Sequence, residues 1–202
     1  MTVFEKYSLW IGFGGVLATF FAVIVAIWGE RIRQRWKRPK LILTLNEPAL
    51  TLTTSGIKGW YYLICVRNEK RTNPAQNVRI LLTRVFKQGP DGAWKERRFS
   101  GPTQVQWRWP GSMPQYSTVG PNELATFGYL HENSDEFILQ LYTIPNNLQR
   151  HIPKNDPTRL EFIAVSDTVQ SPALIIEISW DGEWVEGRME MQEHFIVNEV
   201  IV

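Results

Sequence analysis

The chain has 202 residues, of which 44% are hydrophobic and 12% aromatic, and this length fits one folded domain. Such a composition excludes a disordered or collagen-like chain. The formal net charge of +2 is unevenly distributed, because residues 1–40 hold 7 Lys/Arg against 2 Asp/Glu while residues 41–202 hold 15 against 18. The sequence therefore joins a basic N-terminal piece of net charge +5 to a mildly acidic remainder of net charge −3.

An uncharged run of 20 residues, 9–28, dominates the basic piece. As a helix rising about 1.5 Å per residue, it spans the roughly 30 Å hydrocarbon core of a bilayer. Aromatic residues lie near both ends, with Tyr7 and Trp10 at one and Trp28 and Trp36 at the other, as is typical of membrane interfaces. The run is too long for a cleaved signal peptide. We predict a retained transmembrane helix over residues 9–28, with a buried helix of a soluble protein as the alternative.

The charges that flank this run predict its orientation. One cation, Lys6, precedes it, and six follow it closely: Arg31, Arg33, Arg35, Lys37, Arg38 and Lys40. The positive-inside bias places the short segment 1–8 outside the cell and everything after the helix in the cytoplasm. The basic juxtamembrane segment, residues 29–40, is expected to contact anionic lipid headgroups at the membrane surface, and nucleic acid is not expected as a partner.

Small residues recur at intervals of four along the same run: Gly14, Ala18, Ala22 and Ala26. This spacing aligns them along one ridge of a helix. Because lipid tails give helices no hydrophobic reason to associate, a ridge that lets two backbones approach closely is a common packing surface. We predict packing against another transmembrane helix, from a second copy or a different subunit, although glycine and alanine are also simply common in membrane helices.

After residue 40 the pattern changes to short runs of alternating polarity, separated by clusters of Gly, Pro, Asn and Asp. Strands are predicted at Leu41–Asn46, Gly59–Arg67, Asn77–Lys87, Trp94–Phe99, Gln104–Trp109, Leu124–Leu130, Glu136–Thr143, Leu160–Val165, Ala173–Trp180, Trp184–Gln192 and Phe195–Val202. No helix is expected between them, so they should pair mainly antiparallel. Residues 41–202 are therefore predicted to form an all-β domain, an immunoglobulin-like β-sandwich, with a partly closed barrel as the alternative.

The C-terminal part of the domain shows the clearest alternation. In the run that ends at Trp180, apolar residues at every second position predict one buried face. The Asp181-Gly182 pair that follows is a strong hairpin signal, so Trp184–Gln192 is expected to return as the next strand. The last run, Phe195–Val202, is strongly apolar and should be a covered strand or add to a partner's sheet.

Sequence signatures of catalysis are absent. The chain has no nucleophile elbow, phosphate-binding glycine loop or zinc-binding HExxH motif, and its one cysteine, Cys65, cannot form an internal disulfide. The three histidines, His131, His151 and His194, lie in different segments, where exposed loop positions explain them better than a metal site. We therefore expect no catalytic residues, no metal and no cofactor.

A local concentration of basic residues is the strongest candidate for a ligand site. Lys95, Arg97 and Arg98 lie in one predicted strand beside Trp94, and Arg108 lies in the next. Cations next to an exposed aromatic ring can hold a phosphate or stack on a base. The four basic residues are a candidate site for an anionic ligand, and the alternative is a solvated strand face balanced by acidic neighbours.

Together these features predict a non-enzymatic, single-pass membrane protein. Its cytoplasmic β-sandwich would bind a protein partner as an accessory or scaffold subunit of a membrane complex, through loops and edges held by a rigid framework. The alternative is a membrane effector whose β-domain senses a soluble anionic, nucleotide-like ligand and whose transmembrane helices oligomerise.

Overall fold

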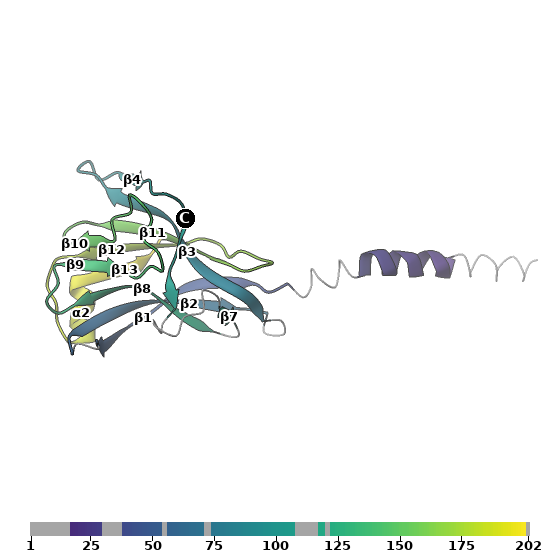
Figure 1. Cartoon of the computed structure of the whole chain (residues 1–202), viewed down its shortest axis with the longest axis horizontal. Helices are drawn as coiled ribbons and strands as arrows, with labels where there is room; N and C mark the ends of the chain where they lie inside the picture. The colour runs from purple at the N-terminus through teal and green to yellow at the C-terminus, as the bar shows by residue number, and fades with distance from the viewer. Residues whose placement is uncertain are drawn as a thin grey trace, which may run out of the picture. The chain divides into compact units, whose positions relative to one another are not determined.

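The computed structural model describes residues 17–29, 38–53, 56–70, 74–107, 117–119 and 122–200. The chain divides into two units, Met1–Arg38 and Pro39–Val202. Within the described residues, the first unit contains one helix and the second contains all the strands (Figure 1).

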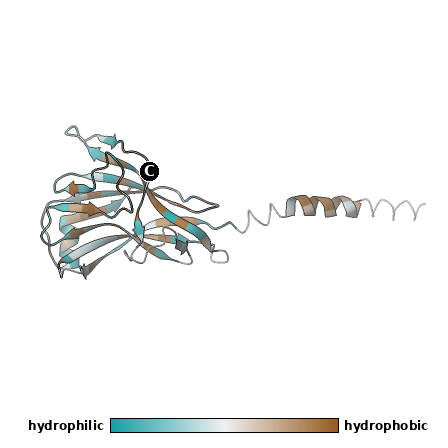
Figure 2. Cartoon of the chain, viewed as in Figure 1, coloured by the Kyte–Doolittle hydropathy of each residue, from teal (hydrophilic) through white to brown (hydrophobic). Residues whose placement is uncertain are grey.

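The helix of the first unit covers residues 17–29 and contains no charged residue (Figure 2). Eight of its large apolar side chains are exposed: Leu17, Phe20, Phe21, Val23, Ile24, Val25, Ile27 and Trp28. At 3.6 residues per turn, these positions cover more than half of the helix circumference, and small residues, including Ala18, Ala22 and Ala26, occupy the rest. In the described part of the chain, no helix combines the length and apolar character needed to cross a membrane. The remainder of the predicted span, residues 9–16, lies outside the described residues, as do residues 1–8 and 30–37.

The strands of the second unit form two sheets. The first follows the order β1 (Leu41–Leu52), β2 (Lys58–Asn68), β8 (Glu123–His131), β9 (Glu136–Leu139), β10 (His151–Pro153), with β6 (Gln106–Trp107) also paired to β8. The second follows the order β13 (Phe195–Glu199), β12 (Leu174–Trp180), β11 (Thr158–Val165), β3 (Ala75–Gln88), β4 (Trp94–Arg97), with β5 (Thr103–Gln104) and β7 (Ser117–Val119) also paired to β3. Every strand pair among the described residues is antiparallel.

The two sheets pack as a β-sandwich around one apolar core, which confirms the prediction of an antiparallel all-β domain. On β12 the predicted inward face is buried: Leu174, Ile176, Ile178 and Trp180. The chain passes from one sheet to the other at Val105, because β5 pairs with β3 and β6 pairs with β8. The described part of the predicted strand Gln104–Trp109, residues 104–107, is therefore divided between the two sheets, and residues 108 and 109 lie outside the described residues.

Aromatic rings from both sheets meet in the core. The first sheet contributes Tyr62, Phe127 and Phe137, and the second contributes Phe162 and Phe195. Ring centroids lie 4.5 Å apart for Tyr62 and Phe195, 5.0 Å for Phe137 and Phe195, and 5.7 Å for Phe127 and Phe162. Each such pair stabilises the fold by about 0.5–1.5 kcal/mol beyond the contribution of the area it buries. This aromatic cluster is therefore a main packing contact between the two sheets.

The segment predicted as the strand Trp184–Gln192 is instead a loop followed by the helix α2 (Arg188–His194), so that prediction is wrong. Asp181 does not begin a two-residue hairpin; its Oδ1 accepts a hydrogen bond, 2.8 Å long, from the amide two residues later. The alternation indicates a strand, but Met, Glu, Gln and Arg all favour helices, and this helix propensity prevails here. The helix buries Met191 and leaves Met189 76% exposed, whereas a strand would have placed both on one face.

Gly128 on β8 has no room for a side chain. A Cβ there would collide with the Phe137 ring and lie 2.9 Å from the carbonyl oxygen of Ile138. We expect Gly128→Ala to destabilise the domain by about 2 kcal/mol and to lower Tm by several degrees in thermal unfolding followed by circular dichroism. The matched control is Gly187→Ala, where the obstacle is the flexible carboxylate end of Glu190. Equal Tm values for the two variants would contradict this packing.

Candidate functional site

The four strands at the outer ends of the two sheets differ in how their free edges are protected. β4 carries charge on three of its four residues, β10 contains Pro153, and β1 contains Pro48 within an irregularity of its pairing with β2. Charges, prolines and bulges all oppose pairing with a further strand. β13 has no lysine, arginine or proline, and its Ile196 is 44% exposed. β13 is therefore the open edge of this pair of sheets.

The hydrogen-bonding pattern turns one set of β13 backbone groups away from β12. In an antiparallel pair, alternate residues exchange hydrogen bonds with the partner strand while the others point outward. The Val200 amide donates to the Ile175 carbonyl, 2.8 Å away, which directs the even-numbered residues of this segment toward β12. The N–H and C=O of Val197 and the N–H of Glu199 therefore face the free edge.

A pocket of about 400 Å³ lies between this edge and β1. Its apolar lining includes Leu45 and Pro48 of β1, Tyr62 of β2, and Phe195 and Val197 of β13. Tyr62 and Phe195 are buried members of the aromatic cluster, so the floor of the pocket is part of the core. We call this pocket and the strand edges beside it the β1–β13 groove.

Two polar contacts cross the β1–β13 groove. The Leu45 amide donates to the Glu199 carboxylate over 2.6 Å, and the Arg188 guanidinium lies 2.7 Å from the Glu47 carboxylate. The Leu45 N–H points away from β2, so Glu199 occupies the position that the carbonyl of an additional strand would take. The groove thus lies between the edges of β1 and β13, which are joined by the Glu199 side chain rather than by backbone hydrogen bonds.

The outer face beside β13 is acidic. A second pocket, of about 300 Å³, is lined by residues that include Ser179, Asp181, Glu193, His194 and Ile196. His194 Nδ1 lies 2.8 Å from the Asp181 carboxylate. Residues 181–199 hold six Asp/Glu against one arginine. We call this region the acidic pocket, because its net charge attracts cations.

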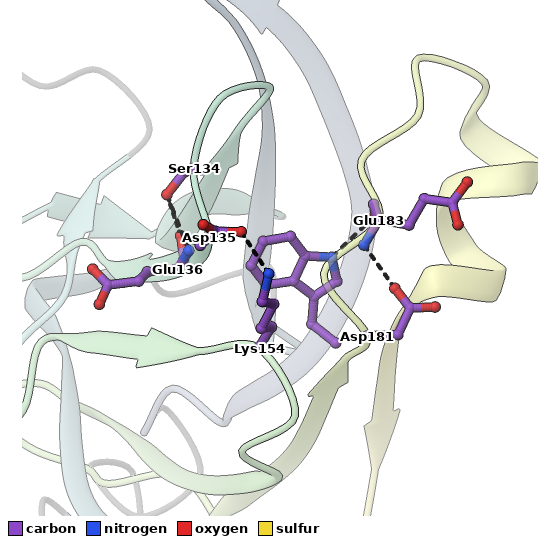
Figure 3. Close-up of polar contacts among 7 residues, drawn as sticks. Ser134, Asp135, Glu136, Lys154, Asp181 and Glu183 are labelled. Carbon is purple, nitrogen blue, oxygen red and sulfur yellow. Dashed lines mark hydrogen bonds and ion pairs between the residues drawn. The ribbon is translucent and has the colours of Figure 1, made fainter.

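Figure 3 shows hydrogen bonds and ion pairs that hold acidic residues near the acidic pocket, in residues 134–136 and in the loop from Asp181. Trp180 Nε1 donates to the Glu183 carbonyl over 3.0 Å, and Lys154 lies 2.9 Å from the Asp135 carboxylate. Within the described ranges, no group of three or more His, Cys, Asp or Glu residues is placed to hold a metal ion. These contacts stabilise the turns that carry the acidic residues.

The residues predicted to bind an anion are only partly brought together. Lys95 and Arg97 share one face of β4, because they are two residues apart on a strand. Arg98 is exposed just after the end of β4, and Arg108 lies outside the described residues. The structure thus describes three of the four cations, two of them on one face.

Neighbouring groups occupy the aromatic part of that predicted site. The Arg159 guanidinium lies 4.1 Å from the centroid of the Trp94 ring, where a base or sugar would have to stack. Lys95 pairs with Asp91 at 3.2 Å, while Arg97 has no ion-pair partner among the described residues. Arg97 and Arg98 are both exposed, and among the described residues neither forms an ion pair that would oppose contact with an anion.

The remaining predicted sites lie in or next to the N-terminal unit. Ala18, Ala22 and Ala26 of the small-residue ridge are exposed on the helix 17–29, and Gly14 lies outside the described residues. Of the six juxtamembrane cations, Arg38 and Lys40 are described and exposed, whereas Arg31, Arg33, Arg35 and Lys37 lie outside the described residues. Lys40 forms an ion pair, 2.7 Å long, with Glu69, the residue that follows β2.

Sequence reasoning does not find the β1–β13 groove, because residues 45–48, 62 and 192–198 come together only in the fold. One signal did point to it. The apolar C-terminal run was expected to be covered or to add to a partner's sheet, and β13 has a covered face at Phe195 and a free edge at Val197.

The Asp181–His194 contact predicts a titration. Hydrogen bonding to Asp181 raises the pKa of His194 above its ordinary value of 6.5. This pair therefore stabilises the fold below pH 6.5, and the contribution is lost as pH rises through the raised pKa. In an NMR titration of the histidine ring protons, we expect Asp181→Asn to lower the pKa of His194. An unchanged pKa would contradict the contact.

Comparison of the chain with protein families, with curated proteins and with solved structures found no match in any of the three. The residues of the β1–β13 groove and of the N-terminal helix therefore carry the functional argument by themselves.

Proposed function

We propose that this chain is a single-pass membrane-anchored protein whose cytoplasmic β-sandwich binds a protein partner, as an accessory or scaffold subunit of a membrane complex. The observation that carries the anchor is the uncharged helix 17–29 with eight large apolar side chains exposed along it. In sequence the uncharged run extends back to residue 9. The cations at residues 31–40 support an orientation with the β-sandwich in the cytoplasm.

Removing the apolar side chains of this helix from water lowers the free energy considerably. Removing one fully exposed large apolar side chain from water stabilises by roughly 1.5–3 kcal/mol, so covering eight that are 38–66% exposed amounts to roughly 10 kcal/mol. That is comparable with the whole stability of a typical domain, about 5–15 kcal/mol. A lipid bilayer, together with a neighbouring helix packed on the small-residue ridge, supplies such a cover.

The strand order supports the finer, immunoglobulin-like assignment of the sandwich. In one sheet β1, β2, β8 and β6 follow the order A-B-E-D, and in the other β4, β3, β11 and β12 follow the order C′-C-F-G. Such sandwiches serve many unrelated functions, so the fold by itself assigns none. The partner-binding role is argued instead from the open edge of β13 and the apolar groove beside it.

The alternative role, sensing of an anionic ligand, is favoured by one observation, the exposed Arg97 and Arg98 at the end of β4. It is the weaker proposal, because Arg159 already covers Trp94 and Asp91 already neutralises Lys95.

Charges placed on the helix test the anchor. The full chain is expected in the membrane fraction after extraction with alkaline carbonate. The double variant Phe20→Arg, Ile24→Arg should move into the soluble fraction, since two arginines at mid-helix cost about 5–7 kcal/mol in a bilayer. The matched control Phe20→Leu, Ile24→Leu should stay with the membrane. Release of the unaltered chain into the soluble fraction by alkaline carbonate would refute the anchor.

Bulky residues on the ridge test helix packing. We expect Ala18→Ile with Ala22→Ile to shift the full chain toward smaller assemblies in detergent, because branched side chains keep the backbones apart. Val23→Ile with Ile27→Val, off the ridge, serves as the control. Light scattering coupled to size exclusion measures the mass, and an unchanged assembly would exclude the ridge as a contact.

A further inference from the structure

The free edge of β13 offers backbone groups to an additional strand. Val197 directs both its N–H and its C=O away from β12, and Glu199 directs its N–H the same way. Among the described residues, no hydrogen bond satisfies the Val197 N–H. Addition of an extended segment to such an edge is a common mode of peptide recognition, in which main-chain hydrogen bonds give affinity and pockets for alternate side chains give specificity.

The two faces of β13 select different side chains. Phe195 and Val197 line the apolar pocket of about 400 Å³, a size within the usual range of ligand pockets. Ile196 lies opposite Ser179 on the other face, where Glu193 and Asp181 help to line the acidic pocket. A strand laid along β13 would therefore direct every second side chain into the apolar pocket and the others toward the carboxylates.

Glu199 adds a third element of recognition. Its carboxylate now accepts a hydrogen bond from the Leu45 amide across the groove. A strand between β13 and β1 would bring its own carbonyl to Leu45 and release the carboxylate for a cationic side chain. A hydrogen bond to an ionised group is about twice as strong as a neutral one, so the released carboxylate favours a cationic side chain at the end of the segment, on the groove face.

We propose that β13 binds an extended segment of a partner protein as an additional strand, and that this segment alternates apolar side chains, seated in the β1–β13 groove, with basic side chains facing the acidic pocket. This inference rests on the proposed function, since it names the segment that the partner presents to the β-sandwich. A second copy of β13 is a poor occupant, because Phe195–Glu199 contains no basic residue and carries its own carboxylate into the same place.

The test uses the full chain in detergent micelles and a fluorescein-labelled octapeptide of four Arg–Leu repeats, with an octapeptide of four Glu–Leu repeats as the charge control. We expect saturable binding of the first peptide in fluorescence anisotropy, and at least about tenfold weaker binding of the second. Hydrogen–deuterium exchange of segment 195–199 should slow on binding, since the Val197 and Glu199 amides become hydrogen-bonded.

Two modifications separate strand addition from simple charge attraction. Val197→Pro removes an N–H that points outward and that β12 does not use, so this variant should keep the fold and bind the Arg–Leu peptide about tenfold more weakly. The control Val197→Thr keeps the N–H and should bind the peptide as the unaltered chain does. If the proline variant does not fold, two N-methylated peptides replace it. Methylation of one alternate set of peptide amides should abolish binding, and methylation of the other set should not.

The overturning results are equally specific. Equal affinity for the Arg–Leu and Glu–Leu peptides, equal affinity for both methylated peptides, or unaltered exchange at residues 195–199 would each exclude the proposed strand addition. Tighter binding of a peptide with the sequence of residues 31–38 would overturn the partner and assign the edge to a second copy of this chain. None of these results bears on carbonate extraction, so the membrane anchor stands or fails independently.

Discussion

Five aromatic rings, from β2, β8, β9, β11 and β13, hold the two sheets of this domain together, and Phe195 contacts two of the rings from the opposite sheet. The close approach of Phe137 to β8 is possible only because Gly128 has no side chain. Phe195 is also the first residue of β13, so the same contact that closes the core fixes the position of the strand edge. The core and the candidate site are thus built from one set of contacts.

The position of β13 explains why its two faces differ so strongly. Its inner face continues the apolar core, and its outer face lies beside α2 and the loop from Asp181, where acidic residues are concentrated. An edge strand between an apolar groove and an acidic surface distinguishes the two sides of any segment laid against it. A segment laid along this edge would be selected by the alternation of its side chains between the two faces. A flat apolar patch, which has one face only, does not distinguish that alternation.

Much of the fold follows from the sequence because alternation has a local cause. The buried face of β12 could be predicted from residues 174–180 alone, since every second side chain on a strand points to the same side. The segment from Trp184 could not, because its alternation indicates a strand while its Met, Glu, Gln and Arg residues favour a helix, and packing of Met191 decides between them. The division of residues 104–107 between two sheets depends on which distant strands lie opposite, and no local pattern records that.

The candidate site was less accessible to sequence reasoning for the same reason. Its walls come from β1, β2 and β13, and the contact that joins its rims links residues 45 and 199. The basic cluster near Trp94 was visible as a composition, but the ring is covered by Arg159, which lies on β11, far along the chain. The apolar C-terminal run remained the one sequence feature that pointed to the edge.

The crossing at Val105 bears on how the domain folds. One residue separates a strand of the second sheet from a strand of the first, so neither sheet can reach its final pairing while the other is absent. The central strands β3 and β11 pair across a long stretch of intervening chain, so few contacts can form early from local segments. Folding dominated by such distant pairings is slow, typically milliseconds to seconds, and the short crossing makes it a single cooperative event. During that interval the uncovered β13 edge would be open to pairing with wrong strands.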